Sequence, residues 1–275
     1  MNEKVIHNYG KLKPSFFYFP LALLALIVFY LFTQSALNIN GYIQIQTYWF
    51  YALNGWLSRF PLMQQNFTHL GDTFVLLTLL TVLFVRAPTL WETLLSATIV
   101  SAIFSSCLKS LFSIPRPSVA LSQNTFVIIG EELTGYSSLP SGHSITIFTA
   151  VGCIILGFMP KKIINKLVWC ILLVAFGLGL AFSRVAVGAH FPLDVVIGSV
   201  IGYISALVGI FINKKFNAWQ WISNKRYYPF FIALFGISAV ILVSKIIDEN
   251  LLVYYLCILS LIISIYACIK KMATK

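Results

Sequence analysis

Three short segments of this sequence hold the residue types that bind and transfer phosphoryl groups. They are "KSLFSIPRP" (residues 109–117), "PSGH" (140–143) and "SRVAVGAHFPLD" (183–194). Only 10% of the chain is charged, so ionisable side chains gathered in this way are expected to face a cavity or a partner. The residues that could act are Lys109, Arg116, Ser141, Gly142, His143, Arg184, His190 and Asp194.

The basic residues and the PSGH segment predict a seat for an anion. Lys109 supplies a mobile positive charge, while Arg116 and Arg184 supply planar groups that match phosphate oxygens. Pro140 stands where a helix would start, so the amides of the next three residues lack intrahelical partners and can donate to the same anion. Gly142 lets the backbone approach the anion closely.

The third segment predicts a nucleophile. His190 and Asp194 lie four residues apart, and Pro192 between them can occupy the first turn of the next helix. A carboxylate at this spacing can keep one imidazole nitrogen protonated and leave the other free to attack. His143, on a different helix, is then available as the general acid for the leaving oxygen. Together these roles predict phosphoryl transfer among positive charges.

Each of these residues, taken alone, has a simpler interpretation. Lys109 could anchor the end of a helix with its long side chain. Either arginine could form a structural ion pair with Asp194 or Glu131, and His143 could cap a helix. The combination of the three segments favours the phosphate site over these separate roles.

The rest of the chain predicts the membrane helices that must position these residues. The sequence is 59% hydrophobic and has a mean hydropathy of +0.88, more than the core of a soluble domain needs. Continuous apolar runs of about 20 residues favour membrane helices over a barrel. We predict an all-α polytopic bundle with about eight spans, at residues 16–34, 73–89, 90–110, 140–159, 167–187, 192–212, 229–247 and 251–269.

The distribution of basic residues predicts the orientation of this bundle. With the N-terminus inside, inner segments hold 14 of the 19 lysines and arginines, the bias that orients membrane helices. The three candidate segments then share the outer face. This bias accounts for the net charge of +11, so no nucleic-acid partner is expected.

Two further features bear on processing and on cofactors. The first apolar run follows Lys11 and Lys13, as in a signal peptide, but it is long and "LFTQSALN" is a poor cleavage site, so we expect a retained anchor. The five cysteines show no CxxC spacing, which indicates neither a disulfide framework nor a metal cluster. No cofactor and no metal are expected.

Two outer loops are candidates for selecting the substrate. Residues 35–72 carry the aromatic run "YIQIQTYWFYALNGWL", which suits the headgroup region and predicts either an interfacial helix or a simple aromatic belt. Residues 118–139 join the first two candidate segments.

The three segments resemble the K-x6-R-P, P-S-G-H and S-R-x5-H-x3-D motifs of the type 2 phosphatidic acid phosphatase superfamily, which also includes vanadium haloperoxidases. Every defining position is matched, and the resemblance covers about residues 16–212. It implies a six-helix core and metal-independent hydrolysis of phosphate esters through a phosphohistidine. His190 would be the nucleophile and Asp194 its orienting partner. The resemblance assigns phosphate-binding or acid roles to Lys109, Arg116, Ser141, Gly142, His143 and Arg184.

The chain also departs from the family pattern. Residues 1–212 would form the lipid phosphatase core, whereas residues 213–275 would add a cytoplasmic loop and a further transmembrane hairpin. Packing, lipid contact and dimerisation are all open roles for this hairpin, and the oligomeric state is open too.

A six-helix core without an outer domain leaves the tail of the substrate in lipid, so a lipid phosphate is favoured over a soluble ester. The candidates are undecaprenyl pyrophosphate, phosphatidylglycerophosphate, phosphatidic acid and lipid A phosphate. The alternative is a transporter or binding protein for anionic lipid headgroups, which would not need His190 and Asp194 at this spacing. A haloperoxidase would bind vanadate but is normally soluble. We expect an integral protein of the bacterial inner membrane with its site facing the periplasm or exterior.

Overall fold

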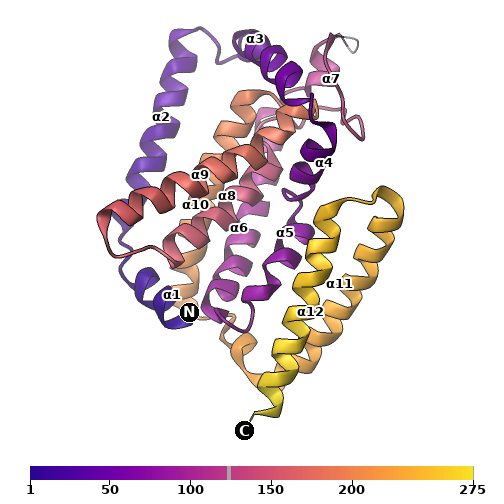
Figure 1. Ribbon diagram of the computed structural model, residues 1–275. Coiled ribbons are helices and arrows are strands. Elements are labelled where there is room, and N and C mark those ends of the chain that lie inside the picture. The colour runs from indigo at the N-terminus through magenta and orange to yellow at the C-terminus, as the bar shows by residue number, and fades with distance from the viewer. Residues whose placement is uncertain (123–124, 275) are drawn as a thin grey trace.

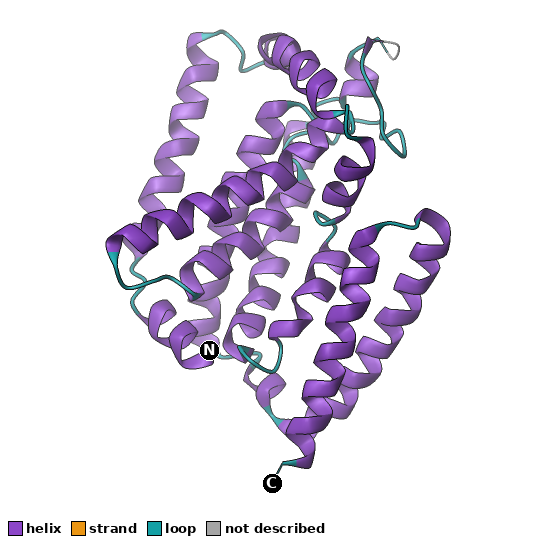
Figure 2. Cartoon of the chain, in the orientation of Figure 1, coloured by secondary structure: helices purple, strands orange, loops and turns teal. Residues whose placement is uncertain are grey.

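The computed structural model describes residues 1–122 and 125–274, which are helical and contain no strand (Figures 1 and 2). The all-α prediction is therefore confirmed. The longer helices are α2 (Tyr18–Thr33), α3 (Ile39–Leu57), α6 (Pro88–Phe112), α8 (Gly142–Gly157), α9 (Ile163–Ala186), α10 (Pro192–Phe216), α11 (Tyr228–Glu249) and α12 (Leu252–Ala273). The shorter elements are α1 (Asn2–Gly10), η1 (Pro14–Phe17), α4 (Pro61–His69), α5 (Thr73–Leu80), η2 (Thr81–Leu83), α7 (Pro117–Ala120), η4 (Gln220–Ser223) and η5 (Lys225–Tyr227).

Within the described residues, six helical segments are long and apolar enough to cross a membrane, so the protein is an integral membrane protein. They are Pro14–Thr33, Pro88–Ala120, Ile163–Ala186, Pro192–Phe216, Lys225–Glu249 and Leu252–Ala273. These correspond to six of the eight predicted spans. A seventh, predicted at 140–159, is α8, whose 16 residues extend only about 24 Å, less than the hydrocarbon layer.

The span predicted at 73–89 is shorter than expected, because α5 and η2 together run only from Thr73 to Leu83. With α4 they form a pair of helices bent by 79°, which is apolar enough to count as one broken span. The carboxylate of Asp72 accepts a hydrogen bond from the Val75 amide and starts α5 at this bend. Pro88 then begins α6, because proline fits the first turn of a helix and cannot continue one.

Helix α10 packs against α8, α6, α9 and α2 at the centre of the bundle. Gly198 and Gly202, four residues apart, bring α10 very close to α8. A Cβ built at Gly198 would lie 2.7 Å from the carbonyl oxygen of Ser141, and one at Gly202 would overlap the carbonyl of Ile145. Small residues at this spacing let membrane helices approach closely. The N-terminal ends of α8 and α10, which carry two candidate segments, are thereby held together.

Helix α3 lies across the end of the bundle that is opposite the two termini (Figure 1). One face is buried and carries Tyr42, Gln46, Phe50 and Asn54, each four residues after the last. The opposite face exposes aromatic rings such as that of Trp49, which is 61% exposed. Residues 35–72 were open to two interpretations, a helix or a simple aromatic belt, and α3 shows that a helix is present.

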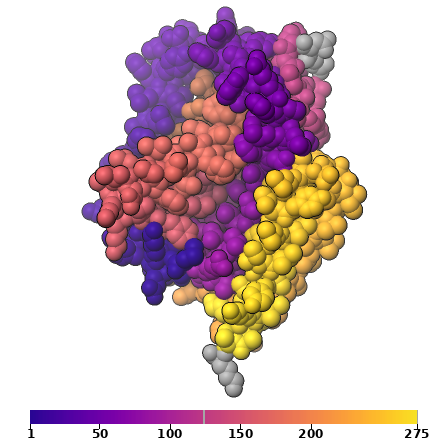
Figure 3. Space-filling model, viewed as in Figure 1, coloured from indigo at the N-terminus to yellow at the C-terminus, as the bar shows by residue number. Residues whose placement is uncertain are grey.

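The C-terminal hairpin, α11 and α12, lies beside α5 and η2 (Figures 1 and 3). The ring of Phe84, which follows η2, contacts the rings of Phe231 and Phe235 on α11, with centroids 4.7 and 5.4 Å apart. Packing against the core, one of the roles left open by the sequence, therefore occurs.

Both termini lie at one end of the molecule (Figure 1), and the chain near them carries exposed lysines such as Lys11, Lys214 and Lys270. The Lys214 ammonium lies 3.4 Å from the carbonyl oxygen of Gly10, which ends α1. The Lys225 ammonium lies 2.7 Å from the carbonyl oxygen of Thr274, near the C-terminus. Helix ends that are distant in sequence thus meet at this basic end of the molecule.

Candidate active site

The three candidate segments meet at the end of the bundle that α3 covers. The first includes the end of α6 and the start of α7, the second starts α8, and the third joins α9 to α10. Contacts between them are direct: Arg116 lies against His190, and the Ser141 amide donates to the carbonyl of Asp194 over 3.0 Å. The structure therefore brings together the residues that the sequence singles out.

His190 is buried, with 1% of its surface exposed, and both ring nitrogens have defined neighbours. Its Nδ1 lies 2.8 Å from the backbone carbonyl oxygen of Ser138, which can only accept, so Nδ1 carries the proton. Nε2 then keeps its lone pair, which accepts a hydrogen bond from Nη1 of Arg116 over 3.3 Å. Burial, and then the charge of Arg116, holds the pKa of the His190 imidazole well below its usual value. The ring is thus a neutral base with Nε2 available.

Asp194 supports this arrangement in a different way from the one expected. Its Oδ2 lies 3.7 Å from Nδ1 of His190, beyond hydrogen-bonding distance. Oδ2 instead accepts from the Ser138 hydroxyl over 2.6 Å and from the Phe191 amide over 2.9 Å. Oδ1 accepts from the Tyr42 hydroxyl over 2.7 Å. Asp194 therefore fixes the Ser138 segment and the turn of His190, and the Ser138 carbonyl orients the imidazole directly.

Three cations surround this centre. Arg116 donates through Nη1 to the Ala189 carbonyl over 3.1 Å, which places its guanidinium next to His190. Arg184, with 5% of its surface exposed, donates to the Thr68 hydroxyl, while its Nε has no hydrogen-bond partner among the described residues. Lys109 interacts electrostatically with both arginines. A buried N–H without a partner beside two other cations is what an anion-binding site requires.

The start of α8 supplies further donors. The helix begins at Gly142, and Ser141 is its N-cap, with its hydroxyl accepting from the Ser144 amide over 3.4 Å. The Ser141 amide has no partner within α8, as expected, but it donates to the carbonyl of Asp194 on α10 and is therefore not free for an anion. Among the described residues, the amides of Gly142 and His143 have no hydrogen-bond partner, so they remain for an anion at the positive end of the helix.

Gly142 and His143 also lie next to the cations. A Cβ built at Gly142 would lie 3.3 Å from Nζ of Lys109, so the lysine extends over the glycine. His143 lies within electrostatic range of Arg184, His190 and Lys109. The predicted acid and the predicted nucleophile thus belong to one cluster.

Three residues of this site are not predicted from the sequence: Tyr42, Thr68 and Ser138. Ser138 had a signal, because it stands two residues before the PSGH segment. Tyr42 and Thr68 lie in the stretch 35–72, whose aromatic run predicts an interfacial helix or an aromatic belt and a part in selecting the substrate, but no contact with Asp194 or Arg184. Their site partners, Asp194 and Arg184, are 152 and 116 residues away in the chain.

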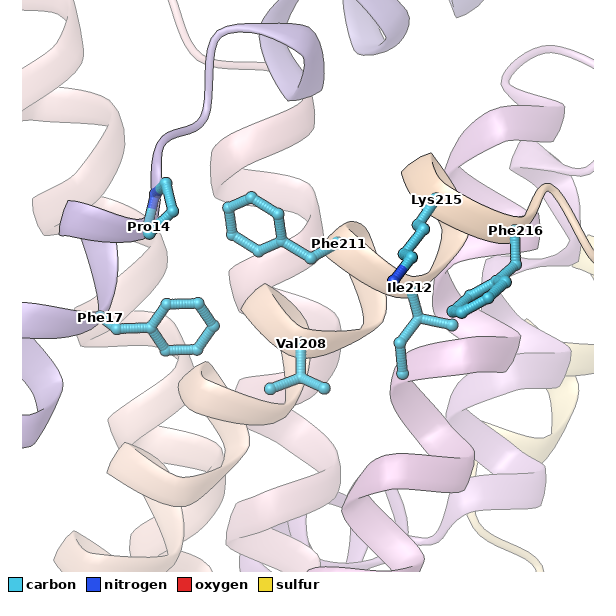
Figure 4. A pocket seen from close by; sticks show the side chains of 7 residues that line it. All are labelled: Pro14, Phe17, Val208, Phe211, Ile212, Lys215 and Phe216. Carbon is cyan, nitrogen blue, oxygen red and sulfur yellow. The ribbon is translucent and has the colours of Figure 1, made fainter.

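Other parts of the described chain offer less chemistry. No group of three or more His, Cys, Asp or Glu side chains among the described residues is placed to hold a metal ion. A pocket of about 260 Å³ opens between η1 and α10, at the other end of α10 from Asp194 (Figure 4). Phe17 and Phe211 stack across it at 5.7 Å, and Lys215 is the charged residue in its lining.

Two known proteins are similar to this chain. The bacitracin transport permease protein BcrC of Bacillus licheniformis is 34% identical over 121 residues, which are 44% of this chain and 54% of that protein. The match thus spans about half the length of this curated relative. The crystal structure of Aquifex aeolicus LpxE is similar with a TM-score of 0.50 and 25% identity, over 61% of this chain and 95% of that chain. A model of the PAP2 superfamily matches residues 90–221 of this chain, which contain all three candidate segments.

Proposed function

We propose that this protein is a membrane lipid phosphatase that hydrolyses a lipid phosphate or pyrophosphate through a phosphohistidine on His190. The observation that carries the proposal is the state of this imidazole. Nδ1 is held by the Ser138 carbonyl, and Nε2 keeps its lone pair beside the Arg116 guanidinium. A neutral, oriented imidazole among cations is suited to attack a phosphorus atom whose charge the cations offset.

In the first step, Nε2 of His190 attacks phosphorus and the bond from phosphorus to the leaving oxygen breaks. Lys109, Arg116 and Arg184, with the free amides at the start of α8, hold the phosphoryl oxygens during this transfer. His143 donates a proton to the leaving oxygen, so that the lipid departs as an alcohol or as a lipid monophosphate. The negative charge of the bound phosphate offsets the neighbouring cations and favours a protonated His143.

In the second step, a water molecule attacks the phosphorus of the phosphohistidine. His143, now neutral, takes a proton from this water, and the bond from phosphorus to Nε2 breaks. Inorganic phosphate leaves, His190 recovers its lone pair, and His143 is protonated again. No group outside the protein is needed to balance the reaction.

An apolar cavity next to the site supports a lipid substrate. Its volume is about 500 Å³, and it lies between α2, α6 and α10. Tyr42, which bonds to Asp194, and Leu139, which precedes the PSGH segment, belong to its lining. A lipid whose phosphoryl group lies at His190 can therefore keep its hydrocarbon chain in this apolar cavity. Undecaprenyl pyrophosphate, phosphatidylglycerophosphate, phosphatidic acid and lipid A phosphate are the substrates to compare.

The name of the Bacillus licheniformis relative, a transport permease, supports a second candidate function. A transporter for anionic lipid headgroups could use the same three cations. It would have no use for an imidazole whose Nδ1 is fixed and whose Nε2 faces the anion site. Release of inorganic phosphate distinguishes the two functions, because transport leaves the ester intact.

The test is phosphate release by purified protein in detergent from each of the four lipids, with and without a chelator. We expect release from at least one lipid, unchanged by the chelator and inhibited by vanadate, which imitates five-coordinate phosphorus. Rapid quenching with radioactive substrate should trap an acid-labile, base-stable label that His190→Ala abolishes. Retention of that label in His190→Ala would show that another residue is the nucleophile, and magnesium-dependent activity would show a different mechanism.

A further inference from the structure

The end of α4 contacts the candidate site on one side and the C-terminal hairpin on the other. Helices α4 and α5 have nine and eight residues, and the chain bends by 79° between them. Helices this short are marginal on their own, so the position of the bend depends on what packs against it. The bend, residues 69–72, therefore lies where support from the hairpin can reach the site.

Two contacts join the end of α4 and the bend to the site. The Thr68 hydroxyl accepts a hydrogen bond from Nη1 of Arg184. A Cβ built at Gly71 would lie 2.7 Å from both Cβ and Cδ2 of His143, so the glycine backbone packs directly on this ring. The positions of a phosphate-binding arginine and of the proposed acid thus both depend on the bend.

Three side chains join the bend to the tip of the hairpin, and we call them the hairpin cluster: His69, Glu249 and Tyr254. Nε2 of His69 lies 3.0 Å from Oε2 of Glu249, the last residue of α11. The Tyr254 hydroxyl on α12 donates to the same oxygen over 2.6 Å and lies 3.1 Å from Nδ1 of His69. Both nitrogens of this third histidine are therefore held by the hairpin.

A backbone contact strengthens the same junction. The Val253 amide, at the start of α12, donates to the Asn66 side chain on α4 over 3.0 Å. Val253 and Tyr254 are 2% and 0% exposed, so the junction is well packed. The tip of the hairpin is thus fixed to α4 at two successive turns, just before the bend.

We propose that the C-terminal hairpin positions Arg184 and His143 through the hairpin cluster, with His69 as a positioning residue. This inference rests on the proposed function and concerns the same site. Without the cluster, the short helix α4 would move and Thr68 would lose its place against Arg184. That guanidinium already has one nitrogen without a partner, so it has little else to hold it. The ring of His143 would also lose the surface of Gly71.

The test uses the full-length protein with a lipid phosphate and with nitrophenyl phosphate, whose leaving group needs little protonation. Tyr254→Phe removes one hydroxyl that makes two contacts of the hairpin cluster and keeps the buried ring. Glu249→Gln tests the same cluster by a second route, because it replaces the carboxylate that contacts both His69 and Tyr254. The matched control is Tyr255→Phe. Tyr255 also lies on α12, but its side chain is exposed and its hydroxyl donates to Asn250, outside the hairpin cluster.

If the cluster positions the acid, turnover of the two variants should fall about tenfold more on the lipid than on nitrophenyl phosphate. This difference is smaller than the full contribution of a positioned general acid to the rate, because His143 is displaced and not removed. Tyr255→Phe should match the wild type on both substrates. If turnover instead falls equally on the two substrates, in proportion to the loss of folded protein, the cluster serves stability alone and the inference is overturned. Wild-type protein that releases no phosphate from any lipid would overturn the proposed function, and the inference with it.

Discussion

His190 takes its orientation from a backbone carbonyl, and the carboxylate four residues later acts through that backbone. The Ser138 carbonyl is 2.8 Å from Nδ1, whereas Asp194 is 3.7 Å away and bonds to the Ser138 hydroxyl. A carbonyl cannot donate, so this geometry fixes the tautomer even when Asp194 is protonated. Asp194→Asn should therefore lower turnover less than His190→Ala, because the ring and its carbonyl partner both remain.

The two histidines are expected to respond differently to the leaving group. His143→Ala should slow hydrolysis of a lipid phosphate by about 10² to 10⁴, the usual contribution of a positioned acid. An activated ester such as nitrophenyl phosphate should recover part of that loss, because its leaving oxygen needs less protonation. Steady-state kinetics with both substrates measure the difference. Equal losses on both would mean that His143 only completes the helix end.

The pH dependence should report on His190. Protonation removes the Nε2 lone pair, so activity should fall as pH drops through the pKa of this ring. Because burial and Arg116 lower that pKa, the acid limb of kcat/KM should lie below about pH 6.5, the ordinary histidine value. Arg116→Gln removes a neighbouring positive charge and should move this limb to higher pH while lowering the rate.

Wild type and Arg116→Gln are compared on one substrate, so that ionisation of the substrate contributes equally to both profiles. The measurement is kcat/KM between about pH 4 and pH 8, with reversibility checked by returning each sample to neutral pH. An acid limb that stays in place after Arg116→Gln would contradict the assignment of this titration to His190.

At the scale of elements, the sequence predicts which helix ends carry the chemistry. The three segments lie at the ends of apolar runs that share one face when spans and charges are counted, and the structure places them together. The apolar runs also predict α6, α9, α10 and the hairpin, because hydrocarbon thickness sets the length of a spanning helix.

Other elements could not be predicted, for identifiable physical reasons. The bend between α4 and α5 depends on a cap at Asp72 and on packing against α12, which hydropathy does not reveal. The buried stripe of α3 is hard to recognise because two of its four residues, Gln46 and Asn54, are polar. These amides bond to the Leu193 amide and to the Val185 carbonyl, so they are buried by partners far away in the chain.

We expect the buried face of α3 to stabilise the protein through its contact with Asp194. Tyr42→Phe removes one of the three donors to the buried Asp194 carboxylate, and we expect a loss of about 1 to 3 kcal/mol in stability. Thermal unfolding in detergent, together with turnover, measures the effect. Tyr48→Phe is the control, because Tyr48 lies on the same helix and is 72% exposed. Equal stability of the two variants would contradict a supporting role for α3.

At the scale of the whole molecule, the two ends of the bundle carry different chemistry. One end holds both termini (Figure 1) and exposed lysines near them, such as Lys214 and Lys270, and the other end holds the candidate site, which α3 covers. Between them, α9 exposes large apolar side chains such as Ile171 and Leu172, at 66% and 62%, as expected for a helix that faces lipid. The polarity of the molecule thus predicts how it is oriented in a membrane.

We expect the basic end to face the cytoplasm and the candidate site to face outward, because positively charged segments are retained inside. The probes are Ser122→Cys, exposed after α7, and Asn165→Cys, exposed at the start of α9 near the basic end. Both are made in a background with Cys107→Ser, since Cys107 is an exposed native cysteine. In intact cells, a membrane-impermeant maleimide should label the probe at position 122 and spare the one at 165, while permeabilised cells should show both. Labelling at 165 alone in intact cells would reverse the orientation and place the phosphate site, with its substrate, on the cytoplasmic leaflet.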